Sequence, residues 1–400
     1  MDVRPYDYRD GDDTLEFTRV DLPYIPSHAH AAITEPSALP RAAEPPRRHA
    51  RVVALVPARN EGESIQDTVN ALFAQTHRFD QIVVVTNNCT DDGATARLAQ
   101  ESGAEVIDAG VQKHYKAGAL NSALDLILPD LSDDDFVLIQ DADTVLNPDF
   151  VRAGLAAMRD DVGGVCARYD MQAPHSVLEQ LQANEFTRSR RKITRDRSTV
   201  KIPVGIATLF RVKTIRAVIE ARSTGVLPGS ATFYNLESLC EDYRLTLDLK
   251  MLGYRLVSPP DCRPKTHAMP TLKKLWGQRV RWTEGAKNDL RDLGWNPVTR
   301  PYILAQWNRL LAMLSPFVYV AYLLSLELTY GRIVWELPWL TVNAIVAVER
   351  VVTVRRGGWK AMALAALILP EMAYDWFLAA TYLSGLMRHL RSAKHEWKET

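Results

Sequence analysis

The sequence predicts an α/β fold with a mostly parallel central sheet, followed by membrane-associated helices. Three features of the chain lead to this prediction. Short, continuously apolar runs alternate with stretches of helical spacing between residues 51 and 140. Polar side chains directly follow several of these runs, and apolar residues then crowd into 304–386. Strands that are apolar without alternation are buried on both faces, which is typical of a parallel sheet covered by helices.

The elements follow one another as strand, helix, strand. The first apolar run, 52–56, is closed by Pro57, and Ile65, Val69 and Leu72 then recur with helical spacing. By the same criteria we predict strands at 52–56, 81–85, 105–107 and 136–139, and helices at 64–74, 94–102, 116–128 and 243–252. Sheets of this type bind ligands beyond the carboxyl ends of their strands. The polar residues after each strand are therefore the candidates for a site.

The 400 residues divide into three predicted parts: a polar, proline-spotted arm at 1–50, an α/β domain at 51–300 and membrane-associated helices at 301–400. Basic and acidic residues both number 48, and this zero net charge argues against a nucleic-acid-binding chain. The 4 cysteines form no C-x-x-C pair, which fits a reducing compartment. The arm has no apolar run of the signal-peptide type.

A run of basic side chains occupies residues 187–201. A solvated helix face explains such a run. A patch that faces anionic lipid headgroups explains it as well. The sequence leaves both interpretations open.

Two carboxylates follow the last predicted strand of the series. Asp141 and Asp143 are separated by one residue, so their side chains point in roughly the same direction. Hard oxygen ligands in this arrangement suit Mg²⁺ or Mn²⁺, ions that also take phosphate oxygens. A solvated acidic turn has the same composition, but the position after a buried strand favours the metal.

Two further segments carry chemistry. Glu241 and Asp242 open a predicted helix, where carboxylates are favoured by the helix dipole and where one of them can also serve as a general base. In the string 278–282, Arg279 and Arg281 offer fork-shaped donors for phosphate, and Trp282 offers a flat platform for a sugar. A basic helix with an anchoring tryptophan at a membrane boundary explains the string equally well.

Taken together, these segments resemble the motifs of the family 2 inverting glycosyltransferases of GT-A fold, in the membrane-bound branch that includes hyaluronan, chitin and cellulose synthases. The likeness covers roughly residues 52–282 and extends more weakly into the apolar tail. The matching segments stand in family order at 56–61, 85–91, 116–121, 141–143, 241–242 and 278–282. The resemblance implies that residues 51–300 form a GT-A glycosyltransferase domain with a nucleotide-binding sheet.

The resemblance also implies a role for each segment. Nucleotide and donor binding would fall to Pro57, Ala58, Asn60, Glu61, Asn87, Lys116, Asp141, Gln278, Arg279 and Arg281. Metal binding, of Mn²⁺ or Mg²⁺, would fall to Asp143 with Asp141. Asp242, beside Glu241, would be the catalytic base, and Trp282 would hold the acceptor sugar.

The chain departs from the family pattern at two positions. Asn87 stands where the second-strand motif usually carries an aspartate. Its amide oxygen can still accept from a base N–H, but without charge, which puts the family's usual preference for uridine in doubt. Cys240 replaces the usual threonine before the Glu241–Asp242 pair, and the carboxylates themselves remain.

We expect an inverting transfer, in which Asp242 takes a proton from an acceptor hydroxyl while the metal and Arg281 stabilise the departing diphosphate. Three functions stay open. The first is a synthase that extends a polysaccharide from a UDP-sugar, and the second transfers a single sugar to a lipid or protein acceptor. The third is a membrane protein that binds nucleotide sugars without catalysis. The string 278–282 favours the first, the short apolar tail favours the second, and the intact carboxylates argue against the third.

The tail predicts a multi-pass protein of the cell membrane that contacts membrane lipids, with its catalytic domain in the cytoplasm. Residues 310–326 are uncharged and just long enough to span, and 337–348 would return. Arg355, Arg356 and Lys360 then mark the cytoplasmic side. We expect 361–387 to form two helical pieces, broken near Pro370, that lie in the interface or re-enter, with an ordinary third span as the alternative.

Overall fold

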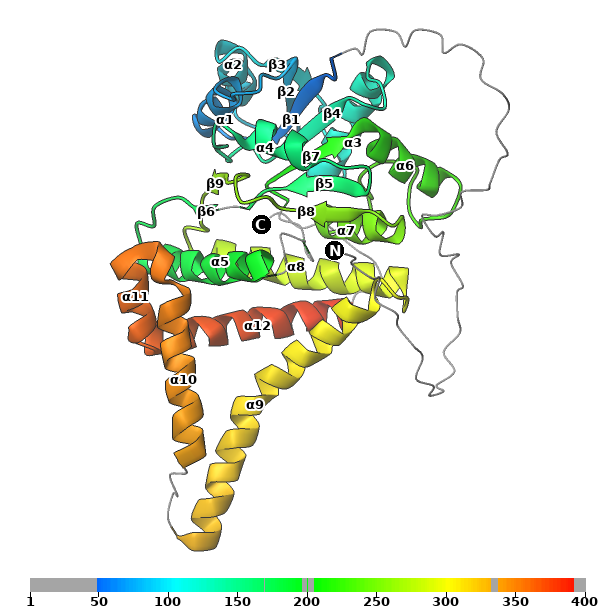
Figure 1. Ribbon diagram of the computed structural model, residues 1–400. Coiled ribbons are helices and arrows are strands. Elements are labelled where there is room, and N and C mark those ends of the chain that lie inside the picture. Colours follow the sequence, from blue (N-terminus) through cyan, green and yellow to red (C-terminus); the bar gives the residue numbers. More distant parts are fainter. Residues whose placement is uncertain (1–48, 169, 196–199, 201–204, 332–336, 392–400) are drawn as a thin grey trace, which may run out of the picture.

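The computed structural model describes residues 49–168, 170–195, 200, 205–331 and 337–391 (Figure 1). Nearly all of the predicted arm at 1–50 lies outside these residues. The centre of the fold is a seven-stranded sheet with the order β3-β2-β1-β4-β7-β5-β8. Its strands are β1 (Val52–Ala58), β2 (Gln81–Thr86), β3 (Glu105–Asp108), β4 (Phe136–Gln140), β5 (Val162–Cys166), β7 (Ala207–Arg211) and β8 (Arg255–Val257). A separate parallel pair joins β6 (Asp170–Met171) to β9 (Lys265–Thr266).

The sheet is mostly parallel, which confirms the predicted fold class. Strands β1 to β4 run parallel, and β7 lies antiparallel between β4 and β5. The register pairs Ala58 at the end of β1 with Thr86 at the end of β2, so the residues that follow both strands emerge side by side. All four strands expected from apolar runs are present, each within two residues of its predicted bounds.

Helices cover both faces of the sheet, because alternate residues of each strand face opposite sides. Val53 and Leu55 pack with residues of α3, α6 and α7, whereas Val52, Ala54 and Val56 pack with residues of α1, α2 and α4. The helices of this domain are α1 (Ser64–Phe73), α2 (Ala94–Glu101), α3 (Tyr115–Ile127), α4 (Phe150–Ala157), α6 (Val212–Ser223) and α7 (Glu241–Met251), and a short 3-10 turn, Leu128–Asp130, follows α3.

Three long helices form a layer beneath the sheet: α5 (Val177–Arg195), α8 (Leu272–Leu293) and α12 (Leu369–Arg391) (Figure 1). Helices α8 and α12 approach closely at Gly385, where a side-chain carbon would lie 3.0 Å from the carbonyl oxygen of Val280. The rings of Trp276 and Phe377 meet edge to face at 5.7 Å nearby. The layer therefore joins the C-terminal helices to the α/β domain.

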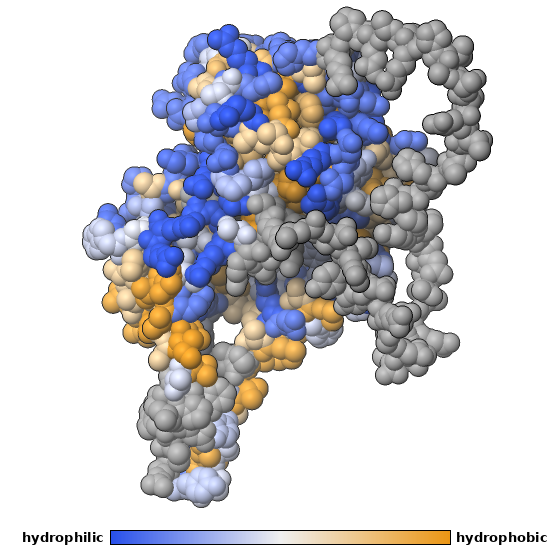
Figure 2. All heavy atoms as spheres, viewed as in Figure 1, coloured by the Kyte–Doolittle hydropathy of each residue, from blue (hydrophilic) through white to orange (hydrophobic). Residues whose placement is uncertain are grey.

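Two further helices project away from this layer. They are α9 (Arg300–Tyr330) and α10 (Leu337–Thr353). After a 3-10 turn at Arg355–Gly357, α11 (Gly358–Ala366) lies against the end of the layer, where its Ala361 carbonyl accepts from Asn184 of α5 at 3.3 Å (Figure 1). Figure 2 shows hydrophobic side chains gathered over this lower part of the molecule, below a mostly hydrophilic α/β domain. In the described part of the chain, α9, with 31 residues, is the helix that is long and apolar enough to cross a membrane by itself.

The stretch 361–387 is divided between two helices. The helical residues 355–366 and α12 meet at an angle of 89°. If this bent pair counts as one broken span, the described residues contain two possible membrane spans, the other being α9. Helix α10 has 17 residues, at the short end of what a bilayer requires. Length and composition thus support one or two spans, and the predicted multi-pass arrangement is not established by them.

Glu371 of α12 is buried and paired with arginines from two other helices. Its carboxylate accepts from Arg188 of α5 at 2.7 Å and from Arg350 of α10 at 2.9 Å. Asn184 adds a bond of 3.1 Å to the same side chain. Arg188 belongs to the basic run 187–201, so this member of the run holds helices together rather than forming a solvated face.

A second buried ionic group joins α6, α7 and α8, the last through Asp289, whose carboxylate lies 3.6 Å from Arg244. Asp248 accepts from Arg222 at 2.5 Å and from Arg244 at 3.1 Å, and the side chains are 0–2% exposed.

Removing one partner leaves an uncompensated buried charge, so we expect Asp248→Ala to lower the free energy of unfolding by about 3–5 kcal/mol. Urea unfolding of the full chain in detergent measures this. The control is Asp133→Ala, which removes an exposed partner of Arg216 and should change stability by less than about 1 kcal/mol; equal losses would contradict the prediction.

Candidate active site

The ends of β1 and β2 form one wall of the candidate site. Pro57 and Ala58 end β1, and the Ala58 carbonyl accepts from the Asn87 backbone N–H at 3.1 Å and from its side-chain amide at 3.4 Å. Asn60 adopts a left-handed conformation with φ of 54° and bonds twice to Thr90, at 2.7 and 3.0 Å. These bonds fix the two loops against each other where Asn87, itself buried, follows its strand.

Lys116 connects three carboxylates that come from two distant parts of the sequence. Its Nζ lies 2.7 Å from Asp141 Oδ1, 3.5 Å from Glu241 Oε1 and 3.6 Å from Asp242 Oδ2. Burial alone would lower the pKa of Lys116, but the charges of the three carboxylates, led by Asp141, outweigh it and raise this pKa well above its usual value. Lys116 is therefore a fixed positive charge at the centre of the predicted site.

Asp143 lies beside this group, with Glu61 close by. Burial and the charge of Asp141 raise the pKa of Asp143, and the nearby His267 opposes the rise. Burial and the charge of Asp143 likewise raise the pKa of Glu61, whose backbone N–H is held by Thr95 Oγ1 at 2.9 Å. Carboxylates crowded in this way favour a cation among them.

Asp242 is held at the first turn of α7. Burial raises its pKa to about 7, the charges of Glu241 and Asp141 add to the rise, and Lys116 opposes it. Gly205 packs directly against this side chain, because a carbon attached there would overlap the Asp242 carboxylate. A buried carboxylate with a pKa near neutrality is suited to accept a proton at physiological pH.

The string 278–282 lies on α8, which passes beside the start of α7. Arg281 donates to the Leu239 carbonyl at 3.3 Å, and its own carbonyl accepts from the Cys240 thiol at 3.6 Å. Burial raises the pKa of this thiol, and Cys240 packs against Gly285 of α8. Arg281 is thus placed next to the Glu241–Asp242 pair.

The structure separates Arg279 from Arg281, because residues two apart on a helix face different sides. Arg279 pairs with Glu185 of α5 at 2.9 Å, and its guanidinium lies 4.7 Å from the ring centroid of Trp282. It is not brought to the carboxylates around Lys116 by any described contact. Trp282 is 37% exposed, and Gln278 is half-buried on the same helix.

Four residues near the site were not expected from the sequence: Gly205, Tyr234, Glu185 and His267. Tyr234 is buried, and its backbone exchanges two hydrogen bonds with the Asn121 side chain at 2.8 and 2.9 Å. Burial and the charge of Asp242 raise the pKa of its hydroxyl. Asn121 lies in the segment 116–121, so this motif residue anchors a loop of the site.

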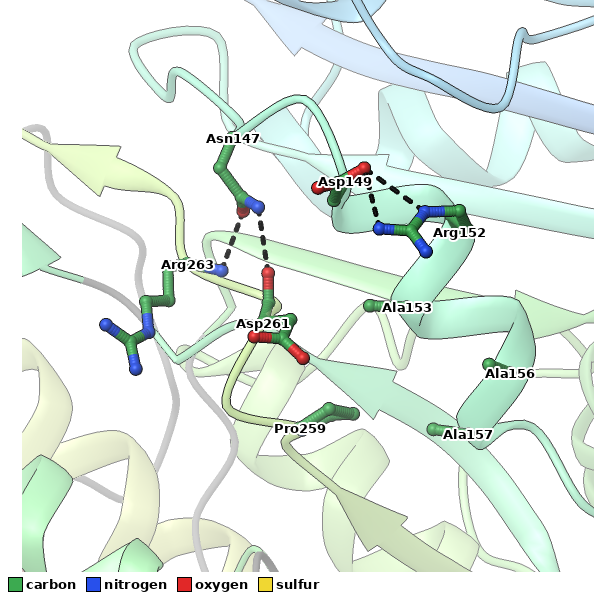
Figure 3. Close-up of a pocket in the computed structure, with 9 residues that line it drawn as sticks. All are labelled: Asn147, Asp149, Arg152, Ala153, Ala156, Ala157, Pro259, Asp261 and Arg263. Carbon is green, nitrogen blue, oxygen red and sulfur yellow. Dashed lines mark hydrogen bonds and ion pairs between the residues drawn. The ribbon is translucent and has the colours of Figure 1, made fainter.

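A surface groove of about 700 Å³ lies elsewhere, between α4 and the loop at 259–263 (Figure 3). Several of its polar groups bond to one another: Asn147 bonds to the backbone of Asp261 and of Arg263, both at 2.8 Å, and Arg152 pairs with Asp149 at 3.0 Å. None of the residues predicted for the site lines this groove. The candidate site therefore remains the carboxylate group around Lys116.

The sheet and the carboxylates at its edge define a glycosyltransferase of GT-A fold. A sequence model described as "Glycosyltransferase like family 2" matches residues 49–285, and the chain belongs to this family. It is 24% identical over 273 residues to the poly-β-1,6-N-acetyl-D-glucosamine synthase of Staphylococcus aureus (strain COL), covering 66% of this chain and 62% of that protein. The corresponding synthase of Staphylococcus epidermidis is 22% identical over 281 residues, covering 68% of this chain and 63% of that protein.

A solved structure extends the fold comparison into the C-terminal helices. The mannosyltransferase PcManGT from Pyrobaculum calidifontis, solved with GDP-Man and Mn²⁺, superimposes with a TM-score of 0.51 at 20% identity. The match covers 86% of this chain and 88% of that chain. The likeness in fold therefore includes helices outside the α/β domain.

Proposed function

We propose that this glycosyltransferase moves a sugar, with inversion, from a nucleotide-diphosphate donor to a hydroxyl of a growing polysaccharide at the cytoplasmic face of a membrane. By family habit the donor is a UDP-sugar. The observation that carries the proposal is the cluster of ion pairs at Lys116. Its Nζ lies within 3.6 Å of carboxylate oxygens of Asp141, Glu241 and Asp242. It brings a donor-side carboxylate and a candidate base into one site.

The residues present suit a divalent cation, Mn²⁺ or Mg²⁺. Asp143 and Asp141 supply hard oxygen ligands, and their mutual repulsion supports a cation between them. Among the described residues, no group of three or more His, Cys, Asp or Glu side chains could hold a metal ion by itself. With two carboxylates from the protein, the ion would take its other ligands from the donor's phosphate oxygens. When bound, such a cation would neutralise charge on the diphosphate.

Four side chains of the protein carry out the remaining steps of the proposed transfer. Asp242 takes the proton of the acceptor hydroxyl as that oxygen attacks the anomeric carbon, and the bond from this carbon to the phosphate oxygen breaks, with its electron pair leaving on the diphosphate. Arg281 offers its guanidinium to the departing phosphate. Lys116 holds Asp141 and the base in place, and Trp282 offers its ring to the acceptor sugar.

A second candidate is the transfer of one sugar to a lipid or protein acceptor. The observation that favours it is the small number of possible spans, one or two in the described chain. A channel that exports a growing polysaccharide is built from several helices.

One experiment distinguishes the candidates. The full chain in detergent is incubated with UDP- and GDP-sugars, Mn²⁺, an oligosaccharide acceptor and membrane lipids. Donor binding is measured by calorimetry, and the products are sized by mass spectrometry. A ladder of lengths supports polysaccharide extension, a single added sugar supports the alternative, and binding without turnover of any donor would overturn both in favour of a binding protein.

The rate should depend on pH through Asp242. A base must be deprotonated to act, so kcat/KM should rise with pH up to about 7, the pKa that burial gives this group, and level off above it. Lys116→Met removes the positive charge that lowers this pKa, so the rising limb should move to higher pH. A profile flat between pH 5.5 and 8 would contradict the assignment.

Asn87→Asp should preserve or tighten the binding of uridine nucleotides, because it restores a charged acceptor for the base N–H. Calorimetric titration with UDP, GDP and CDP measures this. Weaker binding of all three nucleotides would show that Asn87 serves another purpose, such as its bond to the Ala58 carbonyl.

A further inference from the structure

Helix α12 has two unlike faces. Glu371, Tyr374, Thr381, Tyr382 and Gly385 are buried. The opposite face carries an exposed apolar stripe formed by Met372, Trp376, Leu383, Met387 and Leu390, each between 44 and 68% exposed. Steps of three, four and seven residues place these side chains along one side of the helix.

The bilayer is the partner that fits this stripe. Trp376 lies beside Phe317 of α9 with ring centroids 6.3 Å apart, so the stripe is continuous with the helix that is apolar and long enough to span. Arg388 and Arg391 are exposed at the C-terminal end of α12, where they suit anionic headgroups. An apolar stripe with flanking cations is the pattern of a helix that lies in the membrane interface.

The buried face of the same helix is connected to the candidate acceptor platform. The Tyr374 hydroxyl donates to Glu185 Oε2 at 2.7 Å, and the same oxygen accepts from Arg279 Nη2 at 2.9 Å. Arg279 in turn lies 4.7 Å from the ring centroid of Trp282, and its side chain is only 12% exposed. A carboxylate shared between a buried hydroxyl and a guanidinium makes strong, directional bonds.

We propose that the seating of α12 on an anionic lipid bilayer positions Trp282 for the acceptor, through Tyr374, Glu185 and Arg279. Tyr374 and Glu185 are positioning residues, which act on the platform through Arg279. In Figure 1, α12 lies beneath α5 and α8, and its Phe377 contacts Trp276 of α8, the helix that carries Trp282. The inference rests on the proposed role of Trp282 as the acceptor site.

The test uses the full chain in vesicles of phosphatidylcholine and phosphatidylglycerol. Tyr374→Phe and Glu185→Ala break the connection, and Glu185→Gln keeps an acceptor oxygen. The matched control is Tyr382→Phe on the same helix, whose hydroxyl contacts Lys287 and the Gln306 carbonyl instead. A double variant, Met372→Asp with Leu383→Asp, disrupts the stripe.

Three quantities are measured: donor hydrolysis without acceptor, KM for an oligosaccharide acceptor, and amide hydrogen exchange across 276–283. Tyr374→Phe, Glu185→Ala and the stripe variant should each raise the acceptor KM roughly tenfold, the scale of one lost charge-assisted bond, with donor hydrolysis unchanged. They should also speed exchange across 276–283. Glu185→Gln should recover part of the effect, and Tyr382→Phe should behave as wild type.

Two results would overturn the proposal. One is a Tyr374→Phe protein with the acceptor KM and exchange of Tyr382→Phe. The other is an equal loss of donor hydrolysis and transfer, which would indicate a merely structural role. If the wild type turns over no nucleotide sugar at all, the proposed function fails, and the exchange measurement alone still decides whether α12 and α8 are coupled.

Discussion

Replacing Asp242 by asparagine should lower kcat by at least about a hundredfold and leave the donor's Kd within about twofold. Asparagine keeps the shape of the side chain but cannot take a proton, and Asp242 lies in the first turn of α7, outside the loops that follow β1 and β2. Donor titration calorimetry and single-turnover rates measure the two quantities separately.

A substitution at Gly205 tests the role of Asp242 in a second way. Because a side-chain carbon there would overlap the Asp242 carboxylate, Gly205→Ala should displace the base and reproduce the loss of turnover. Asp134→Asn, at an exposed carboxylate outside the site, is the matched control. Equal losses of donor affinity and rate in Asp242→Asn would contradict the assignment of the base.

Asp143→Ala should abolish the part of nucleotide binding that depends on a divalent metal. The substitution removes one of two clustered hard ligands and leaves Asp141 bound to Lys116 at 2.7 Å, so that little remains to hold the ion. Titration of Mn²⁺ in the presence of UDP measures the loss, with Asp149→Ala in the surface groove as control. Full activity of the wild type in excess chelator would contradict a metal site.

The first half of the sheet could be predicted from the sequence, because its strands are uninterrupted apolar runs. β5 was not predicted, since its sequence contains Gly163 and Gly164, which are weak strand formers. Tertiary packing explains why glycine stands at both positions, because side-chain carbons there would crowd Tyr254 and Leu256 of the neighbouring segment. The glycines make room for contacts that local pattern does not reveal.

The site was partly predictable for a similar reason. The resemblance to the family motifs identified Lys116, Asp141 and Asp242 as site residues, and the fold brings these three together. The same resemblance assigned Arg279 to donor binding, whereas in the structure its guanidinium pairs with Glu185. His267 and Gly205 carry no local signal, because their relevance arises only from what packs against them.

The C-terminal break shows what a single residue can indicate. Pro370 predicted an interruption, and the chain turns between Ala366 and Leu369. Ile368 takes a φ of 58° there, an unusual conformation for a β-branched residue. The buried pairing of Glu371 with Arg188 and Arg350, which holds α12 against α5 and α10, required the folded structure.

The most direct test of the account is the anomeric configuration of the product. The full chain is supplied with a UDP-sugar whose sugar is α-linked, together with Mn²⁺ and an oligosaccharide acceptor, and the new linkage is read by proton NMR. A single displacement driven by Asp242 predicts a β-linked product, formed with Mn²⁺ and suppressed by chelator. An α-linked product, or one formed equally well by Asp242→Asn, would contradict the account.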